Sequence, residues 1–271
     1  MPVDAQVLPL GPAQRLQALP KGCRARLAFL VDEWGGERFR KELETRLGRA
    51  LHPAGRDVRG PRTTDHVGIF RQRETGLNFV GLKTPVGRVT GDQVLELARL
   101  AERYGRGQLR FTPTQNVLIP YVADTRLGDL IQEPLLKALP YNPSEVQRGL
   151  VSCTGTDFCN LALIDTKTRA MALAREFERR LESTRPLTVR WSGCPASCGN
   201  HHTADVGLQG CKVKVDGKIV DGVHVFVGGR GGRDPRAGQK IMEDVPCDDL
   251  PAVLDRLIRF FPRGERRKEE A

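Results

Sequence analysis

Two cysteine-bearing stretches decide the fold of this chain: CTGTDFCNLALIDTKTRA at residues 153–170 and LTVRWSGCPASCGN at residues 187–200. The first spaces its cysteines as C-x5-C before a predicted helix, and the second spaces them as C-x3-C after a predicted strand. Both pairs are therefore expected on turns, where backbone amides can stabilise thiolate. Four thiolates in two short pairs satisfy an iron–sulfur cubane. The sequence thus predicts a [4Fe–4S] cluster with the ligands Cys153, Cys159, Cys194 and Cys198.

Zinc and disulfides are the alternative uses of these cysteines. A zinc ribbon more commonly shows C-x2-C in both halves, so the spacing favours the cluster over a zinc-stabilised interaction protein. Residues 1–19 lack a basic start followed by a long apolar run, and no stretch approaches the roughly 20 apolar residues of a membrane span. We therefore expect a cytoplasmic protein that binds no membrane and whose thiols stay reduced.

Residues 147–264, which hold six of the seven cysteines, are predicted to form an α/β cluster-binding domain. Asp216-Gly217 predicts a hairpin turn between two short strands. Cys211 and Cys247 are expected to be buried small hydrophobic residues. The pattern of apolar residues predicts helices at 166–183 and 248–261 and strands at 187–191, 212–215, 218–220 and 223–227.

Residues 65–146 are predicted to form a ferredoxin-like half domain with the order β-α-β-β-α. Thr90 and Gln93 have the spacing of a capping box, and Gly105 would end the helix that they begin. Strands are expected at 77–82, 109–112 and 117–122, and a second helix at 126–139 with a kink at Pro134. The chain as a whole is therefore assigned to the α+β class.

The ends of the chain are predicted to lie outside these two domains. Residues 1–50 are expected to form a helical arm, interrupted at Gly35-Gly36. Residues 51–64, rich in Pro, Gly and Arg, are interpreted as a linker, and residues 265–271 as a charged tail. The sequence contains 43 Lys and Arg against 33 Asp and Glu, a formal charge of +10 that favours an acidic partner.

The cysteine pattern resembles that of the sirohaem and [4Fe–4S] reductases, the family of ferredoxin-nitrite reductases and assimilatory sulfite reductases. C-x5-C, a helix and then Gly-Cys-Pro-x-x-Cys-Gly are similar to its cluster signature. The resemblance extends to three further stretches: TGDQVLELARLAERYGRGQLRFTPTQNVLIP at 90–120, HHTADVGLQG at 201–210 and VPCDDLPAVLDRLI at 245–258. The family implies reduction of nitrite to ammonia, or of sulfite to sulfide, with electrons from an external donor such as ferredoxin.

The resemblance also implies roles for individual residues. The four cysteines become cluster ligands, and the sulfur of Cys198 would also reach the sirohaem iron. Arg110, Arg190 and His201 become candidates for cofactor binding, and Arg110 with Gln115 for catalysis. Thr114 stands where the N-terminal half of the family has an anion-binding arginine, and Ala196 stands where the family usually has Asn.

The chain resembles only the C-terminal one of the two halves that family members usually contain. We therefore expect an N-terminal-type half, or a second copy of the chain, as a partner. Sirohaem carries eight carboxylates, so the basic charge needs no nucleic acid to explain it. Two alternatives stay open: a non-catalytic electron-transfer half that needs a partner, and an enzyme of corrinoid synthesis similar to precorrin-3B synthase.

Overall fold

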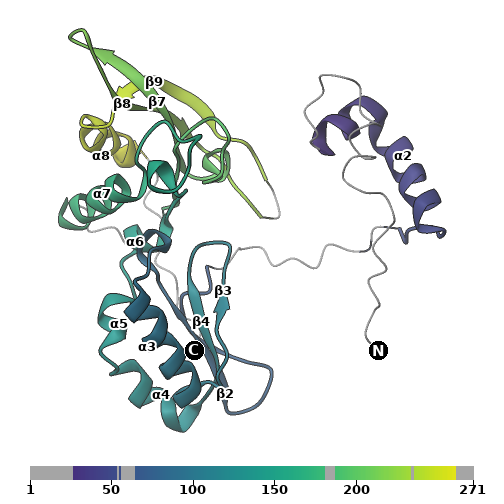
Figure 1. Ribbon diagram of the computed structural model, residues 1–271, viewed down its shortest axis with the longest axis vertical. Coiled ribbons are helices and arrows are strands. Elements are labelled where there is room, and N and C mark those ends of the chain that lie inside the picture. The colour runs from purple at the N-terminus through teal and green to yellow at the C-terminus, as the bar shows by residue number, and fades with distance from the viewer. Residues whose placement is uncertain (1–26, 54, 56–64, 181–186, 233–234, 261–271) are drawn as a thin grey trace. The chain divides into compact units, whose positions relative to one another are not determined.

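The computed structural model describes residues 27–53, 55, 65–180, 187–232 and 235–260, and it divides into two compact units, Met1–Val58 and Arg59–Ala271 (Figure 1). In the first unit, helix α2 (Leu27–Leu47) is broken at Gly35, whose φ of 74° and ψ of 156° are not helical. Glycine adopts this conformation without steric cost, and the predicted interruption is confirmed. The arm before residue 27 with Cys23, most of the predicted linker and the charged tail lie outside the described residues.

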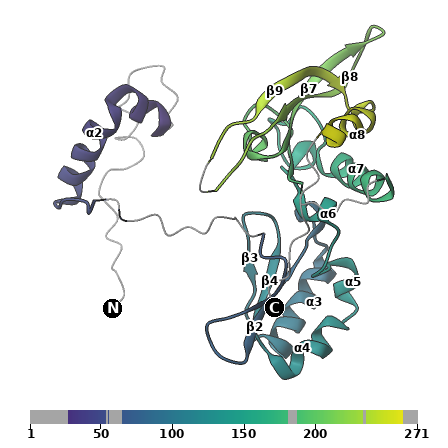
Figure 2. The same cartoon turned by 180° about the vertical axis from the view of Figure 1, so that it is seen from behind.

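The first lobe of the second unit is an antiparallel sheet covered on one face by helices α3, α4 and α5 (Figures 1 and 2). Its strand order is β1-β2-β4-β3. The core between sheet and helices contains Val80, Leu97, Leu100 and Ile119. The elements are β1 (Gly68–Arg71), β2 (Leu77–Leu82), α3 (Gly91–Tyr104), β3 (Arg110–Phe111), β4 (Val117–Ala123), α4 (Asp124–Ile131) and α5 (Leu135–Ala138).

Helix α3 begins and ends where the sequence predicts. The side chain of Thr90 accepts a hydrogen bond from the Gln93 amide at 3.2 Å, and the Thr90 amide donates to the Gln93 side chain at 2.9 Å. This reciprocal capping box satisfies two of the amide groups that a helix start leaves without partners. The amide of Gly105 closes the helix on the carbonyl of Ala101.

Two details of this lobe differ from the prediction. Strand β1 precedes β2, so the order is β-β-α-β-β-α rather than β-α-β-β-α. Only four residues long and mostly exposed, β1 carries little of the alternation that marks a half-buried strand. The helix expected at 126–139 is two helices, because α4 ends at Ile131 and Pro134, which has no N–H to donate, caps the start of α5.

The second lobe is a five-stranded sheet in the order β5-β6-β7-β8-β9. β5, β6 and β7 run parallel, whereas β8 and β9 continue the sheet antiparallel. Helices α7 and α8 cover one face (Figure 1), over a core that includes Trp191, Leu208, Val225 and Leu254. The elements are α6 (Glu145–Gly149), β5 (Leu150–Ser152), α7 (Lys167–Arg180), β6 (Val189–Ser192), β7 (Val206–Val215), β8 (Lys218–Val227), β9 (Gln239–Pro246) and α8 (Leu250–Phe260).

The hairpin of this lobe is longer than predicted. Asp216 and Gly217, with φ of 49° and 80°, form the expected turn. The strands around it are continuous over ten residues each, however, because the β7–β8 pairing extends without a break from Val215 and Lys218 to Val206 and Val227. β5, β9 and α6 were not predicted.

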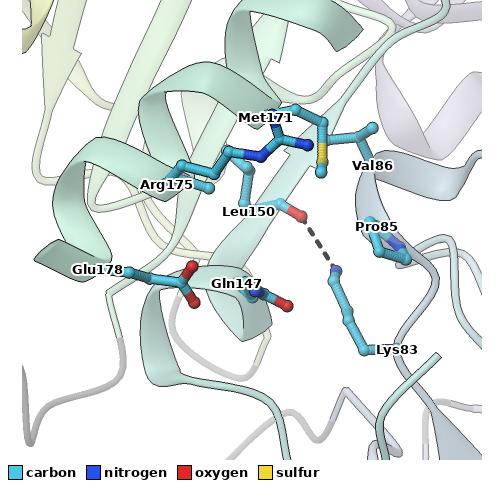
Figure 3. Close-up of a pocket in the computed structure, with 9 residues that line it drawn as sticks. Lys83, Pro85, Val86, Gln147, Leu150, Met171, Arg175 and Glu178 are labelled. Carbon is cyan, nitrogen blue, oxygen red and sulfur yellow. Dashed lines mark hydrogen bonds between the residues drawn. The ribbon is translucent and has the colours of Figure 1, made fainter. Parts of the chain in front are cut away.

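Polar side chains join the two lobes. Lys83, only 1% exposed, donates through Nζ to the carbonyl oxygen of Leu150 at 3.1 Å (Figure 3). Burial lowers the pKa of Lys83 to about 8. The guanidinium of Arg148 pairs with Asp65 at 2.6 Å. Beside Lys83 lies a cavity of about 60 Å³ whose lining includes Met171 of α7.

Within the described part of the chain, no helix has the length and apolar content to cross a membrane.

Candidate functional site

The four cysteines follow two neighbouring parallel strands. Cys153 comes directly after β5 and Cys194 follows β6, and Ser152 at the end of β5 pairs with Trp191, one residue before the end of β6. Because the carboxyl ends of parallel strands meet at one edge of a sheet, both cysteine loops begin side by side. The amide of Gly193 donates to the Sγ atom of Cys153 at 3.1 Å, so the backbone of the second loop already contacts a sulfur of the first.

The first loop is held against the start of α7. Gly155 has a φ of 66°, and a Cβ there would lie 2.7 Å from Oγ1 of Thr166. That hydroxyl donates to the carbonyl of Cys153 at 2.7 Å and lies 3.8 Å from its sulfur. Glycine is therefore required at position 155 both for conformation and for space, and Thr166 fixes the position of Cys153.

The second loop folds back onto the end of β6 through the buried hydroxyl of Ser192. This hydroxyl accepts a hydrogen bond from the Gly199 amide at 3.0 Å and lies 2.9 Å from Nδ1 of His201. A Cβ at Gly199 would lie 2.2 Å from the carbonyl oxygen of Trp191, so only glycine permits this approach. The contacts fix the loop that carries Cys194 and Cys198.

The surroundings of the cysteines differ in accessibility. Cys153, Cys159 and Cys194 are half-buried, whereas Cys198 is exposed. Phe158 and Leu161, on either side of Cys159 in the first loop, expose 83% and 75% of their surface. Exposed large apolar side chains gathered at one place indicate a surface that binds something. The edge formed by the two loops is therefore both sulfur-rich and open.

The four cysteine sulfurs are not gathered as closely as the ligands of a single zinc ion would be. Zn–S bonds of about 2.3 Å place tetrahedral zinc thiolates roughly 3.8 Å apart. Among the residues that the structure describes, the one group of three or more metal-ligating side chains within 4.8 Å is Cys211, His224 and Asp244, so the four cysteines are not drawn together around one ion. A cubane takes one thiolate at each of four separated irons, and amides such as that of Gly193 tune its potential.

The other predicted site residues are distributed unevenly. Gln115 reaches the site, because its Nε2 donates to the carbonyl of Ser152 at 2.6 Å, next to Cys153. His201 lies beneath the second loop, fully buried, and burial lowers its pKa to about 4 with a further contribution from His202, so its imidazole is neutral. Gln115 and His201 are thus both brought to the carboxyl ends of β5 and β6.

The two predicted arginines make contacts away from the sulfur atoms. Arg110 on β3 is exposed, lies over the ring of Tyr121 and donates to its hydroxyl at 3.3 Å. Arg190 on β6 points toward Thr203, with 3.5 Å between Nη1 and Oγ1, and burial lowers its pKa. For the residues described, no contact links either arginine to a cysteine.

Two further cations lie near the first loop: Lys167, which was not predicted from the sequence, and Arg88, which was only a weak candidate there. Lys167, in the first turn of α7, is buried and donates to the carbonyl oxygens of Val86 and Ser152. Burial lowers its pKa, while Cys153 opposes that change. Arg88 forms an ion pair with Asp157 in the first loop. Lys167 lies outside the C-x5-C motif and Arg88 lies far before it in sequence, so the fold is what brings both beside the loop.

A cleft of about 540 Å³ opens beside the first cysteine loop. Arg88 and Thr90 of the first lobe line one side of it, and Asp157 and Phe158 of the loop line the other. The cleft combines a cation with the exposed aromatic ring of Phe158, which precedes Cys159 in the first loop. It is large enough to receive part of an anionic ligand.

Comparison with known proteins identifies the two lobes. Residues 70–137 match the nitrite/sulfite reductase ferredoxin-like half domain, and residues 145–271 match the nitrite and sulphite reductase 4Fe-4S domain. The chain belongs to the nitrite and sulfite reductase family. The family resemblance and the α+β class predicted from the sequence are thereby confirmed, and the second lobe of this reductase-family chain is a 4Fe-4S domain.

Several proteins resemble this reductase-family chain over most of its length. Ferredoxin–nitrite reductase of Synechococcus elongatus is 46% identical over 235 residues, which cover 87% of this chain and 46% of that protein. The chloroplastic ferredoxin–nitrite reductase of Zea mays is 44% identical, covering 91% and 45%. The solved structure of the Mycobacterium tuberculosis NirA protein superposes with a TM-score of 0.81 at 38% identity, covering 91% and 46%. The chain spans about half the length of these relatives.

Proposed function

We propose that this chain binds a [4Fe–4S] cluster through Cys153, Cys159, Cys194 and Cys198, and sirohaem through the sulfur of Cys198. In this arrangement it serves the reduction of nitrite to ammonia with electrons from ferredoxin. Support for nitrite comes from the relatives, which are named ferredoxin–nitrite reductases. The same names favour this function over sulfite reduction and over a corrinoid enzyme similar to precorrin-3B synthase. The cytoplasmic location expected from reduced thiols stays a prediction.

One observation carries the proposal: the two cysteine loops leave adjacent parallel strands at one edge, with the Gly193 amide on the sulfur of Cys153. Residues 40 positions apart thereby share one hydrogen bond. The exposure of Cys198 supports its role as the ligand that also reaches a second group. Sirohaem would supply an iron at which the anion binds and through which electrons arrive.

The chain's own residues have distinct tasks in this proposal. The Gly193 amide, which donates to the sulfur of Cys153, and the Thr166 hydroxyl, which donates to its carbonyl, hold Cys153 in place. Arg88, in the cleft beside the first loop, is placed to bind a carboxylate of the macrocycle. Phe158 would lose its exposed surface against an apolar part of the bound cofactor or against a second half.

The anion pocket would need residues from a second half. Thr114, at the position where the N-terminal half of the family has arginine, lies 2.9 Å from the hydroxyl of Thr112 and accepts from Asn116 at 3.2 Å. The Thr114 hydroxyl is therefore bonded within its own turn. We therefore propose that the converging cations around nitrite come from an N-terminal-type half, whether in the same protein or in another chain, or from a second copy. A purely electron-transferring half is the second candidate, favoured by the same observation.

Complementation tests the proposed function. Haem-loaded, iron-quantified chain is assayed for nitrite and sulfite reduction with a chemical donor, alone as a verified monomer and after addition of an N-terminal-type half. Loss of a charge-assisted contact to the reacting anion costs about 2 to 4 kcal/mol, or two to three decades in rate. We expect a rise of that size on addition. Full turnover by the monomer would contradict the need for a second half, and no turnover in either case would favour the electron-transferring half.

Cys198→Ser tests the bridging ligand. We expect this variant to lose sirohaem and cluster iron together, since one sulfur would serve both groups, and absorption spectra with iron analysis measure both losses. Cys247→Ala is the matched control, because Cys247 is buried and lies outside the two loops. Retention of haem with a full cluster in Cys198→Ser would show that another residue binds the sirohaem iron.

A further inference from the structure

A second group of metal-ligating side chains lies in the five-stranded sheet, on strands β7, β8 and β9. The group consists of Cys211, His224 and Asp244, and one ligand atom of each lies within 4.8 Å of the others. Sγ of Cys211 lies 3.7 Å from Oδ1 of Asp244, and the same oxygen lies 3.7 Å from Nδ1 of His224. None of these residues belongs to the two cysteine loops.

The register of the sheet brings the three residues to one face. His224 pairs with Gln209, two residues before Cys211 on β7, so Cys211 and His224 project to the same side. The partner directly opposite Cys211 is Gly222, which brings no side chain of its own beside the thiol. The strand pairing therefore positions a sulfur and an imidazole nitrogen diagonally across two strands.

A bulge in the neighbouring strand adds the carboxylate. The β8–β9 pairing shifts register between Val223 and Val225, opposite Asp244. Asp244 adopts a φ of 53°, an uncommon conformation that aspartate tolerates better than most residues. Its amide donates to Nδ1 of His224, with 3.3 Å between the nitrogens, a bond that a metal ion bound at that nitrogen would replace. Because Val223 pairs with Val245, the adjacent residues His224 and Asp244 come to the same face of the sheet, and Oδ1 of Asp244 lies near both other ligand atoms.

We propose that Cys211, His224 and Asp244 form a mononuclear site for a borderline divalent cation, with Zn²⁺ as the best match and water as the fourth ligand. The site is separate from the cluster edge. Thiolate, imidazole and carboxylate are the three ligand types that Zn²⁺ uses in proteins, at about 2.3, 2.0 and 2.0 Å. Tetrahedral bonds of these lengths separate ligand atoms by roughly 3.3 to 3.8 Å, close to the two separations of 3.7 Å found here.

The charge balance of the group favours a cation. Burial raises the pKa of the Cys211 thiol to about 11, and the neighbouring Asp244 raises it further, so the metal-free thiol stays protonated. Binding would form a Zn–S bond and release the thiol proton to solvent, leaving one thiolate and one carboxylate against a charge of +2. Other charges around the group are paired among themselves: Lys240 with Glu243, and Lys212 with Asp221.

The position of the group also suits a metal ion. Cys211 is 9% exposed and the His224 side chain 20%, whereas the Asp244 side chain is 63% exposed. The sulfur therefore lies in the interior and the carboxylate at the entrance, which gives the ion and its water a path from solvent. A bound ion would tie the bulged strand β9 to β7 across β8. Cys211, expected from the sequence to be only a small buried apolar residue, thus gains a polar role.

Metal analysis of the full chain provides the test. Untagged protein with a reconstituted cluster is incubated with one equivalent of Zn²⁺, dialysed against a weak chelator and analysed for zinc and iron. We expect about one zinc per chain, and affinity losses of at least about 100-fold in Cys211→Ser, His224→Ala and Asp244→Asn, because even outer-shell changes cost 10- to 100-fold. Cys247→Ala, a buried cysteine after the same sheet, should keep its zinc, and iron should stay unchanged in all four variants.

X-ray absorption at the zinc edge distinguishes this site from the cluster ligands. The proposed site predicts one sulfur at about 2.3 Å and nitrogen or oxygen neighbours at about 2.0 Å. A shell of four sulfurs would show that zinc occupies the cluster cysteines and would overturn the proposal. Unchanged zinc affinity in His224→Ala and Asp244→Asn, whose side chains are near the surface and whose replacement leaves the core intact, would overturn it equally, as would the absence of bound zinc from the wild-type chain.

Discussion

Ser152 and Ser192 end the parallel strands β5 and β6, and replacing each with alanine is expected to change the stability of the protein differently. Ser152 and Ser192 are both buried, and each lies just before a cysteine loop. The Ser192 hydroxyl bonds to the Gly199 amide and to His201, whereas within the described residues the Ser152 hydroxyl has no hydrogen-bond partner. Ser192→Ala should therefore destabilise the second loop, and Ser152→Ala should leave the stability of the fold unchanged.

The magnitude follows from the groups left without partners. Ser192→Ala deprives a buried amide and a buried imidazole nitrogen of their bonds, and each such loss costs about 1 to 3 kcal/mol. Allowing for the hydroxyl that no longer has to be buried, we expect a decrease of about 3 kcal/mol in the free energy of unfolding. Ser152→Ala removes a buried hydroxyl without a partner, so its expected change lies between zero and a small stabilisation.

Two measurements check this pair. Anaerobic urea unfolding gives the difference in stability, and amide hydrogen exchange at Gly199 reports the loop itself. Loss of about 3 kcal/mol corresponds to exchange faster by roughly two decades. Iron retention should fall in Ser192→Ala, because that loop carries Cys194 and Cys198. Equal destabilisation by both substitutions, or a larger effect of Ser152→Ala, would refute the assignment of Ser192 as the residue that fixes the loop.

Three further predictions concern other parts of the chain. Burial lowers the pKa of Lys83 from 10.5 to about 8, so between these pH values the folded state binds fewer protons than the unfolded state. The free energy of unfolding should therefore rise by up to about 3 kcal/mol between pH 8 and 10.5. Unfolding measured as a function of pH should show that Lys83→Met removes this rise. Cys211→Ala and Cys247→Ala should retain full iron in elemental analysis, and loss of iron in either would mean wrongly paired ligands. Arg88→Leu should weaken haem retention in a spectrophotometric titration without lowering acid-labile sulfide, which reports the cluster alone; unchanged retention would exclude its role in the cleft.

Local signals in the sequence predicted much of the fold. The capping box at Thr90 and Gln93, the turn at Asp216-Gly217 and the interruption at Gly35 each depend on a few adjacent residues, and all three are found in the structure. Short strands with little alternation, such as β1 and β5, were missed because three or four residues carry too little periodicity. Strand β9 was missed because its residues are mostly exposed, with a bulge at Asp244.

Only those parts of the candidate site that show a characteristic spacing of residues could be predicted from the sequence. The two cysteine pairs stand out in the sequence, but their meeting depends on the parallel pairing of β5 with β6, between residues about 40 positions apart. The same reason hid the roles of Ser192 and Lys167 and the pairing of Arg88 with Asp157, because their partners come from distant parts of the chain. The group of Cys211, His224 and Asp244 has no recognisable spacing, because it is assembled by strand register and a bulge.

The most direct test of the cluster assignment is the iron and acid-labile sulfide content of the anaerobically reconstituted chain. Wild-type protein and single Ser variants of Cys153, Cys159, Cys194 and Cys198 are compared, with Mössbauer spectra to identify the cluster type. The account predicts four irons and four sulfides per wild-type chain, in the spectrum of a [4Fe–4S] cluster, and loss of that cluster in each variant. A wild-type chain that binds zinc at these cysteines instead of iron, or a variant that keeps the complete cluster, would contradict it.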